Sequence, residues 1–146
     1  MLALYHFVQS TCSIKVRLLL TEKNLDWKDN LLVSSEHPHL SDWYLKLNPN
    51  GVVPTLLDDQ LPIFESTSIL EYLEDKYSQT SFRLFDPYMR SQMRAFLVFL
   101  DVWATPAVRI PSFQFGGLLR KFSAMSDEKF SGFVKRRPLK AEFYKS

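Results

Sequence analysis

The segment from residue 48 to residue 75 constrains the fold more than any other part of this chain. It reads NPNGVVPTLLDDQLPIFESTSILEYLED, with two short apolar runs joined by a polar turn and followed by a helical pattern. Val53-Pro54 comes directly before the first run, and Glu65 and Ser66 stand where the helix begins. Proline favours an extended conformation in the residue before it, and a helix start offers free N–H groups to a carboxylate. The segment therefore predicts strand, turn, strand and helix, with a binding site for a small peptide-like ligand.

Two strand-helix units precede this segment. Residues 2–7 form a short apolar run and predict a buried strand, and residues 26–33 predict a second one. Residues 34–39 are expected to form a loop before a short helix at 41–47. The pattern of residues 12–23 is helical, with four residues expected to face the core: Ile14, Val16, Leu19 and Leu20. The predicted order β-α-β-α-β-β-α is that of a compact α/β domain.

The rest of the chain predicts helices. Residues 78–86 are polar and irregular, as in a linker, and Pro87 is a favoured first residue for the long helix that follows. Pro106 and Pro111 are expected to end that helix, and a short helix capped by Ser126 is predicted at 126–134. The expected organisation is an α/β domain at 1–77, a linker at 78–86 and a helical domain at 87–146.

Composition excludes several classes of protein. The 146 residues are 46% hydrophobic, enough for a packed core, and the one cysteine rules out an internal disulfide framework. No signal peptide and no apolar run of about 20 residues are evident, so we expect a cytoplasmic protein outside the membrane. Eight of the 18 basic residues lie in 120–146, so a main role in nucleic-acid binding is not expected. His37 and His39 predict a surface loop, and no metal site is expected.

Several motifs resemble the soluble glutathione S-transferases. NPNGVVPTL is similar to the family's N-P-x-G-x-V-P-x-L, and FESTSILEYLED to its E/Q-S-x-x-I-x-x-Y-L. Residues 10–25 resemble the S-S-C-S-x-R-V-R segment of the zeta class, and HLSDWYLKLNP resembles bacterial transferases related to β-etherases. The resemblance implies a thioredoxin-like N-terminal domain followed by an all-helical one. Residues 87–146 would supply only its first helices, so we expect a shortened second domain.

The resemblance also implies a chemistry. The nucleophile of this family is the thiol of glutathione, and a free thiol with a pKa of about 8.5 is mostly protonated at neutral pH. Ser10, at the start of the first helix, would lower that pKa by donating a hydrogen bond to the sulfur; from its position alone, simple helix capping is an equal alternative. Thr11 is the next candidate hydroxyl. Cys12 is either a redox thiol or a small packed residue.

A second group of residues would bind the tripeptide. By resemblance, the Val53 backbone pairs with the cysteinyl part of glutathione and the bond to Pro54 is cis. Glu65 and Ser66 would hold the γ-glutamyl end, the alternative being a solvated charge and a helix cap. His39 is a candidate for the glycine carboxylate.

These expectations converge on a glutathione transferase of the detoxification type. It would bind glutathione, activate its thiol and transfer it to an apolar electrophilic small molecule by conjugation or ether cleavage, with isomerisation also open. Homodimers are usual in the family, so we expect one here. Two alternatives stay open: a non-catalytic glutathione-binding module, and a thiol-disulfide or deglutathionylation enzyme using Cys12.

Overall fold

The computed structural model describes residues 1–115 and 123–135. The chain divides into two compact units, Met1–Arg83 and Leu84–Ser146, and the boundary falls inside the segment that the sequence predicts as a linker. Residues 136–146, which hold much of the basic excess, lie outside the described part.

The first unit is built on a mixed sheet of four strands in the order β2-β1-β3-β4. The strands are β1 (Leu2–His6), β2 (Trp27–Leu31), β3 (Thr55–Asp58) and β4 (Leu61–Phe64). β1 is parallel to β2 and antiparallel to β3, and β3 and β4 form an antiparallel hairpin. The turn of the hairpin has positive φ at both Asp59 and Gln60, as a tight two-residue turn requires. The predicted thioredoxin-like arrangement is confirmed.

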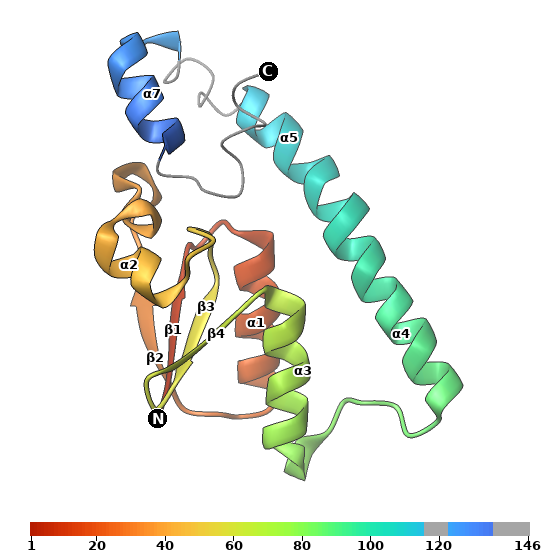
Figure 1. Cartoon of the computed structure of the whole chain (residues 1–146). Helices are drawn as coiled ribbons and strands as arrows, with labels where there is room; N and C mark the ends of the chain where they lie inside the picture. The colour runs from red at the N-terminus through yellow and green to blue at the C-terminus, as the bar shows by residue number, and fades with distance from the viewer. Residues whose placement is uncertain (116–122, 136–146) are drawn as a thin grey trace. The chain divides into compact units, whose positions relative to one another are not determined.

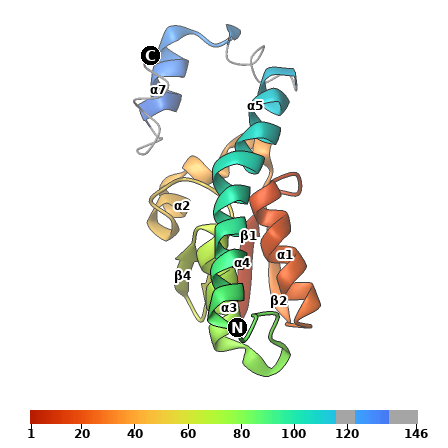
Figure 2. The same cartoon turned by 90° about the vertical axis from the view of Figure 1, so that its right-hand side faces the viewer.

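Helices cover both faces of the sheet (Figure 1). α1 (Thr11–Glu22) and α3 (Ser66–Lys76) pack side by side on one face, as Figure 2 also shows, and α2 (Asp42–Leu47) lies on the other. Alternate residues of a strand point to opposite faces, so Leu2 and Leu4 of β1 and Leu56 of β3 meet α1 and α3. The buried core comprises Leu2, Leu4, Val16, Leu20, Leu56, Ile69 and Leu73.

Three local predictions need correction. Ile14 is 45% exposed, because the buried stripe of α1 runs through Ser13, Val16 and Leu20 and Ile14 lies about 100° or more around the helix from each of them. The predicted loop at 34–39 contains two short 3₁₀ turns, Ser34–Glu36 and Pro38–Leu40. The helix-cap alternative for Ser66 is wrong, because Ser66 is the first residue of α3 and Glu65 occupies its N-cap position.

Asp58 is a buried carboxylate at the end of β3. It is 2% exposed and accepts hydrogen bonds from Lys76 Nζ at 2.5 Å and from the Tyr72 hydroxyl at 2.7 Å. Burial alone would raise the pKa of Asp58, but these hydrogen bonds and the charge of Lys76 outweigh burial and lower it. The cluster joins the sheet to the last turns of α3.

Asp58 should therefore make stability depend on pH. Because its pKa is lower in the folded state, its contribution is present above the ordinary value of 3.8 and is lost as the pH falls through the lowered value. Asp58→Asn is expected to lower the free energy of unfolding by about 2 kcal/mol at pH 7, since a buried charged hydrogen-bond acceptor is removed. Urea denaturation at pH 3 to 7 measures both effects. The exposed control Asp26→Asn should keep the acid dependence of the parent; equal curves for parent and Asp58→Asn would contradict the prediction.

Lys23 ties the end of α1 to the chain after α3. Its side chain is 1% exposed, forms an ion pair with Glu74 at 2.9 Å, and donates to the carbonyls of Tyr77 at 2.9 Å and Thr80 at 2.6 Å. The Phe82 ring covers the ammonium, with its centroid 5.7 Å from Nζ. A buried lysine is costly unless its charge is paired and its N–H groups are bonded, and here both conditions are met.

Arg83 continues this anchoring. Its guanidinium pairs with Glu71 at 2.9 Å and with Asp75, and its backbone N–H donates to Glu74 at 3.2 Å. The polar segment as far as Arg83 is thus bound to α3 and belongs to the first unit.

The described part of the second unit is helical. α4 (Pro87–Phe99) starts with the Asp86 side chain accepting from the Met89 N–H at 2.8 Å, and a π turn (Leu100–Ala104) joins it to α5 (Thr105–Phe115). After the next gap, α7 (Asp127–Lys135) starts beside Ser126, as predicted.

The expectation that prolines end the long helix is wrong. Pro106 is the second residue of α5, which directly follows the π turn, so the helix continues through it. Pro111 lies inside α5 and removes the bond to the Ala107 carbonyl; this residue is exposed, so water can take the place of that bond.

One helix is long and apolar enough to be compared with a membrane-spanning segment, which was not expected from the sequence. Within the described residues, the helix Pro87–Ser112 is 26 residues long and contains an 18-residue window with a mean hydropathy of 1.2, enough by length and composition alone to cross a membrane. Asp101 and Arg109 interrupt its apolar part. Apolar side chains such as Phe96, at 58% exposure, and Trp103, at 67%, equally suit a surface that packs against protein.

Candidate functional site

Strand pairing brings the predicted site residues to one end of the sheet. Tyr5, near the end of β1, pairs with Thr55 at the start of β3, which pairs with Phe64 at the end of β4. The chain therefore leaves β1, enters β3 and leaves β4 at the same end. The candidates on these connections are Ser10, Thr11, Cys12, Val53, Pro54, Glu65 and Ser66.

Ser10 occupies the N-cap position of α1. Its Oγ accepts a long hydrogen bond of 3.3 Å from the Ser13 N–H, and its own N–H bonds to the Phe7 carbonyl at 3.3 Å. Ser10 is half-buried, Thr11 is exposed and Cys12 is half-buried. Within the described residues the Ser10 hydroxyl donates to no acceptor, so its proton is available to a ligand. Capping and donation to a ligand are compatible at this position.

The Val53-Pro54 peptide bond is cis, as expected. A buried network fixes the chain on both sides: the Tyr44 hydroxyl bonds to the Val52 carbonyl and to Thr55 Oγ1, both at 2.8 Å, and Asn48 donates to the same two groups. Burial raises the pKa of Tyr44 to about 12, so the hydroxyl stays protonated. Among the described residues nothing bonds to the backbone N–H or C=O of Val53, which leaves both for an added strand.

Glu65 and Ser66 form the third element of the site. Glu65 has a φ of 68°, a conformation that costs energy in a residue with a side chain and clusters at functional sites. Ser66 is 6% exposed, and its hydroxyl has no partner within the described residues. Its N–H belongs to the free first turn of α3, where the helix dipole favours an anion. This corner therefore combines the carboxylate of Glu65 with two donors of Ser66 that suit the carboxylate of a ligand.

Two residues of this corner are absent from the sequence prediction. Asn50 Nδ2 donates to Glu65 Oε1 at 3.1 Å, and Lys15 Nζ reaches Thr67 Oγ1 at 3.4 Å beside the start of α3. Asn50 lies in the NPNG turn, which the sequence marks only as a turn. Lys15 comes from α1 and stands at a basic position of the S-S-C-S-x-R-V-R segment, a signal that could have pointed to it.

His39 is close to this end of the sheet but buried. It is 7% exposed, and its ring meets Phe7 edge-to-face with centroids 5.1 Å apart and His37 at 5.9 Å. The expected surface loop therefore holds one inward-facing histidine. In the ranges 1–115 and 123–135, no group of three or more His, Cys, Asp or Glu side chains is arranged to hold a metal ion.

Comparison with known proteins identifies the family of this chain. Residues 4–81 match the family model described as "Glutathione S-transferase, N-terminal domain". Protein LigF of Sphingobium sp. is 34% identical over 137 residues, covering 92% of this chain and 53% of LigF. Maleylacetoacetate isomerase of Pseudomonas aeruginosa is 38% identical over 104 residues, covering 68% and 49%.

Solved structures of the same family are also similar to this chain. The crystal structure of the beta-etherase LigF from Sphingobium sp. matches with a TM-score of 0.82 at 34% identity, covering 93% of this chain and 56% of LigF. This chain thus spans about half the length of the curated relatives named above. The matched N-terminal model covers more than half of the chain, and the protein belongs to the glutathione S-transferase family.

Proposed function

We propose that the chain binds glutathione at the end of the sheet where the three connections meet, lowers the pKa of its thiol and directs the thiolate at an electrophilic small molecule. The observation that carries the proposal is the convergence of three unused sets of groups: the Ser10 hydroxyl, the Val53 backbone and the Ser66 hydroxyl and N–H. Each matches a different part of the tripeptide.

The proposed roles follow from these groups. Val53 pairs with the cysteinyl backbone, Ser66 and the start of α3 bind the γ-glutamyl carboxylate, and Glu65 faces its ammonium. Ser10 donates to the sulfur, with Thr11 as a second hydroxyl. His39 keeps the proposed role at the glycine carboxylate only if its ring turns outward, because it is buried.

The reaction is proposed at the level of thiol transfer to an apolar electrophile. Three reactions are candidates. The name of one relative indicates ether cleavage, that of another indicates isomerisation, and conjugation is the third candidate. A homodimer is proposed because α4 exposes apolar residues, and a cytoplasmic location is proposed from the lone cysteine.

A glutathione-binding module without turnover is the second candidate. It is favoured by the position of Ser10, whose Oγ already has a structural role because it accepts from the Ser13 N–H and caps α1. Cys12 chemistry has less support, since this thiol is half-buried.

The binding proposal predicts the effect of Ser66→Ala. The substitution removes a hydroxyl bonded to a carboxylate, and we expect about tenfold weaker binding of glutathione in a calorimetric titration. Ser68→Ala is the matched control, an exposed serine in the same first turn, and should bind as the parent does. Equal affinities for the two variants would remove Ser66 from the site, and a folded parent that does not bind glutathione would overturn the proposed function.

A further inference from the structure

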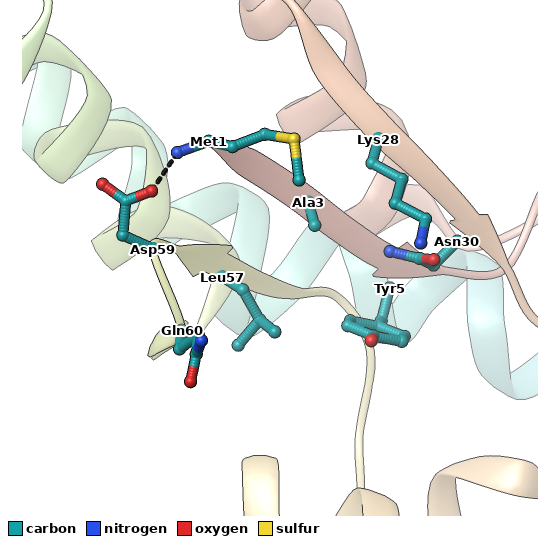
Figure 3. Close-up of a pocket in the computed structure, with 8 residues that line it drawn as sticks. All are labelled: Met1, Ala3, Tyr5, Lys28, Asn30, Leu57, Asp59 and Gln60. Atoms are coloured by element: carbon teal, nitrogen blue, oxygen red, sulfur yellow. Dashed lines mark hydrogen bonds and ion pairs between the residues drawn. The ribbon is translucent and has the colours of Figure 1, made fainter.

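A shallow depression lies on the face of the sheet opposite α1 and α3. Its floor is formed by Ala3, Tyr5 and Leu57, which alternate with the core leucines and therefore point away from the core (Figure 3). The depression is partly open to solvent and has a volume of about 310 Å³. That volume is at the small end of the range for ligand pockets, so it suits a molecule of one or two rings.

The depression is separate from the proposed glutathione site. It extends toward Asp59, in the turn after β3. The last residue of β3 pairs with Leu2 at the start of β1, whereas Val53 and Ser66 adjoin the opposite ends of the strands. The two sites have no lining residue in common.

Two donors on one wall of the depression are unused. Lys28 and Asn30 are two residues apart on β2, where they pair with Ala3 and Tyr5 and share their face of the sheet. Within the described residues, Asn30 Nδ2 is buried without a hydrogen-bond partner and Lys28 has no ion pair. A buried N–H without an acceptor costs free energy, and here it lies beside the positive charge of the exposed Lys28. An anionic acceptor would satisfy both groups.

Aromatic side chains define the rest of the ligand. The Tyr5 ring lies in the depression below these donors (Figure 3) and is 5.7 Å from the ring of Trp43, which is 47% exposed. Flat aromatic surfaces favour a flat partner. We propose that this depression is a second binding site, which takes a small planar aromatic carboxylate with its ring on Tyr5 and its charge on Lys28 and Asn30.

The test uses 2-naphthoate, with 2-naphthamide as a neutral compound of the same shape. The protein is first saturated with glutathione, and amide chemical shifts are followed by NMR during the titration. We expect 2-naphthoate to bind with a dissociation constant below about 1 mM and to shift the amides of Ala3, Tyr5, Lys28, Asn30 and Leu57. Glutathione should not compete.

Variants separate this site from nonspecific binding. Lys28→Gln should weaken the binding of 2-naphthoate about fivefold and leave the binding of 2-naphthamide unchanged, because only the carboxylate is attracted by the charge of Lys28. Asn30→Ala should weaken 2-naphthoate by a similar factor, and it removes no hydrogen bond of the free protein. The exposed control Lys129→Gln should have no effect. No binding, equal binding of the two compounds, an unchanged affinity in Lys28→Gln, or shifts centred on Ser10 and Ser66 would each overturn the proposal.

Discussion

Replacement of Lys23 with methionine is expected to lower the free energy of unfolding by about 3 kcal/mol, as measured by urea denaturation. The change keeps the length of the side chain but removes a buried charge whose partner, Glu74, stays 10% exposed. Loss of one member of a buried pair leaves the other without compensation and is costly. The carbonyls of Tyr77 and Thr80 also lose their donor.

Two further variants identify the cause. Lys46→Met changes an exposed lysine and should stay within about 0.5 kcal/mol of the parent. Adding Glu74→Leu to Lys23→Met should recover part of the loss, because the uncompensated carboxylate is then gone. A stability for Lys23→Met within 0.5 kcal/mol of the parent would contradict the anchoring role of this side chain.

Ser10→Ala is expected to lower the rate of glutathione conjugation about 100-fold, in an assay with an aryl halide. A rate loss of about this size is expected when an enzyme loses one fixed hydrogen-bond donor that faces a developing negative charge. Affinity for glutathione should change little, because the binding groups at Val53 and Ser66 remain. The same substitution should cost about 1 kcal/mol of stability, because Ser10 also caps α1.

Ser10→Asp distinguishes the two roles. Aspartate is a good N-cap but an ionised carboxylate has no proton to donate, so this variant should regain stability and stay inactive. Recovery of the rate with the cap would show that Ser10 acts only through the helix. Loss of activity in Cys12→Ala with a normal rate in Ser10→Ala would favour the thiol-disulfide alternative. Binding without any turnover in the parent would favour the non-catalytic module.

Periodicity and turn chemistry were enough to predict the framework. The short apolar runs of β1 and β3, the polar turn between β3 and β4 and the stripe of α3 are local signals, and α3 begins at the residue expected, Ser66. The cis bond at Pro54 followed from a motif resemblance, not from a local signal. These features depend on residues close together in the chain.

Contacts between distant residues could not be predicted. Lys23 reads as a solvated lysine at a helix end, but it is 54 residues away from the carbonyl of Tyr77 that it binds. His6 is 1% exposed and bonded to Asp29 at 2.7 Å, which no pattern in β1 indicates. The Asn50–Glu65 bond likewise joins two turns that are adjacent only after the sheet has formed.

The measurement that tests the central claim most directly is the pKa of the thiol of bound glutathione, read from the ultraviolet absorbance of the thiolate as the pH is varied. The protein should be present above saturation, so that the bound thiol dominates the signal. We predict a pKa of about 7 or lower for the bound thiol, against about 8.5 for a free thiol, and a return toward 8.5 in Ser10→Ala. A bound thiol that titrates at about 8.5 in the parent would contradict it.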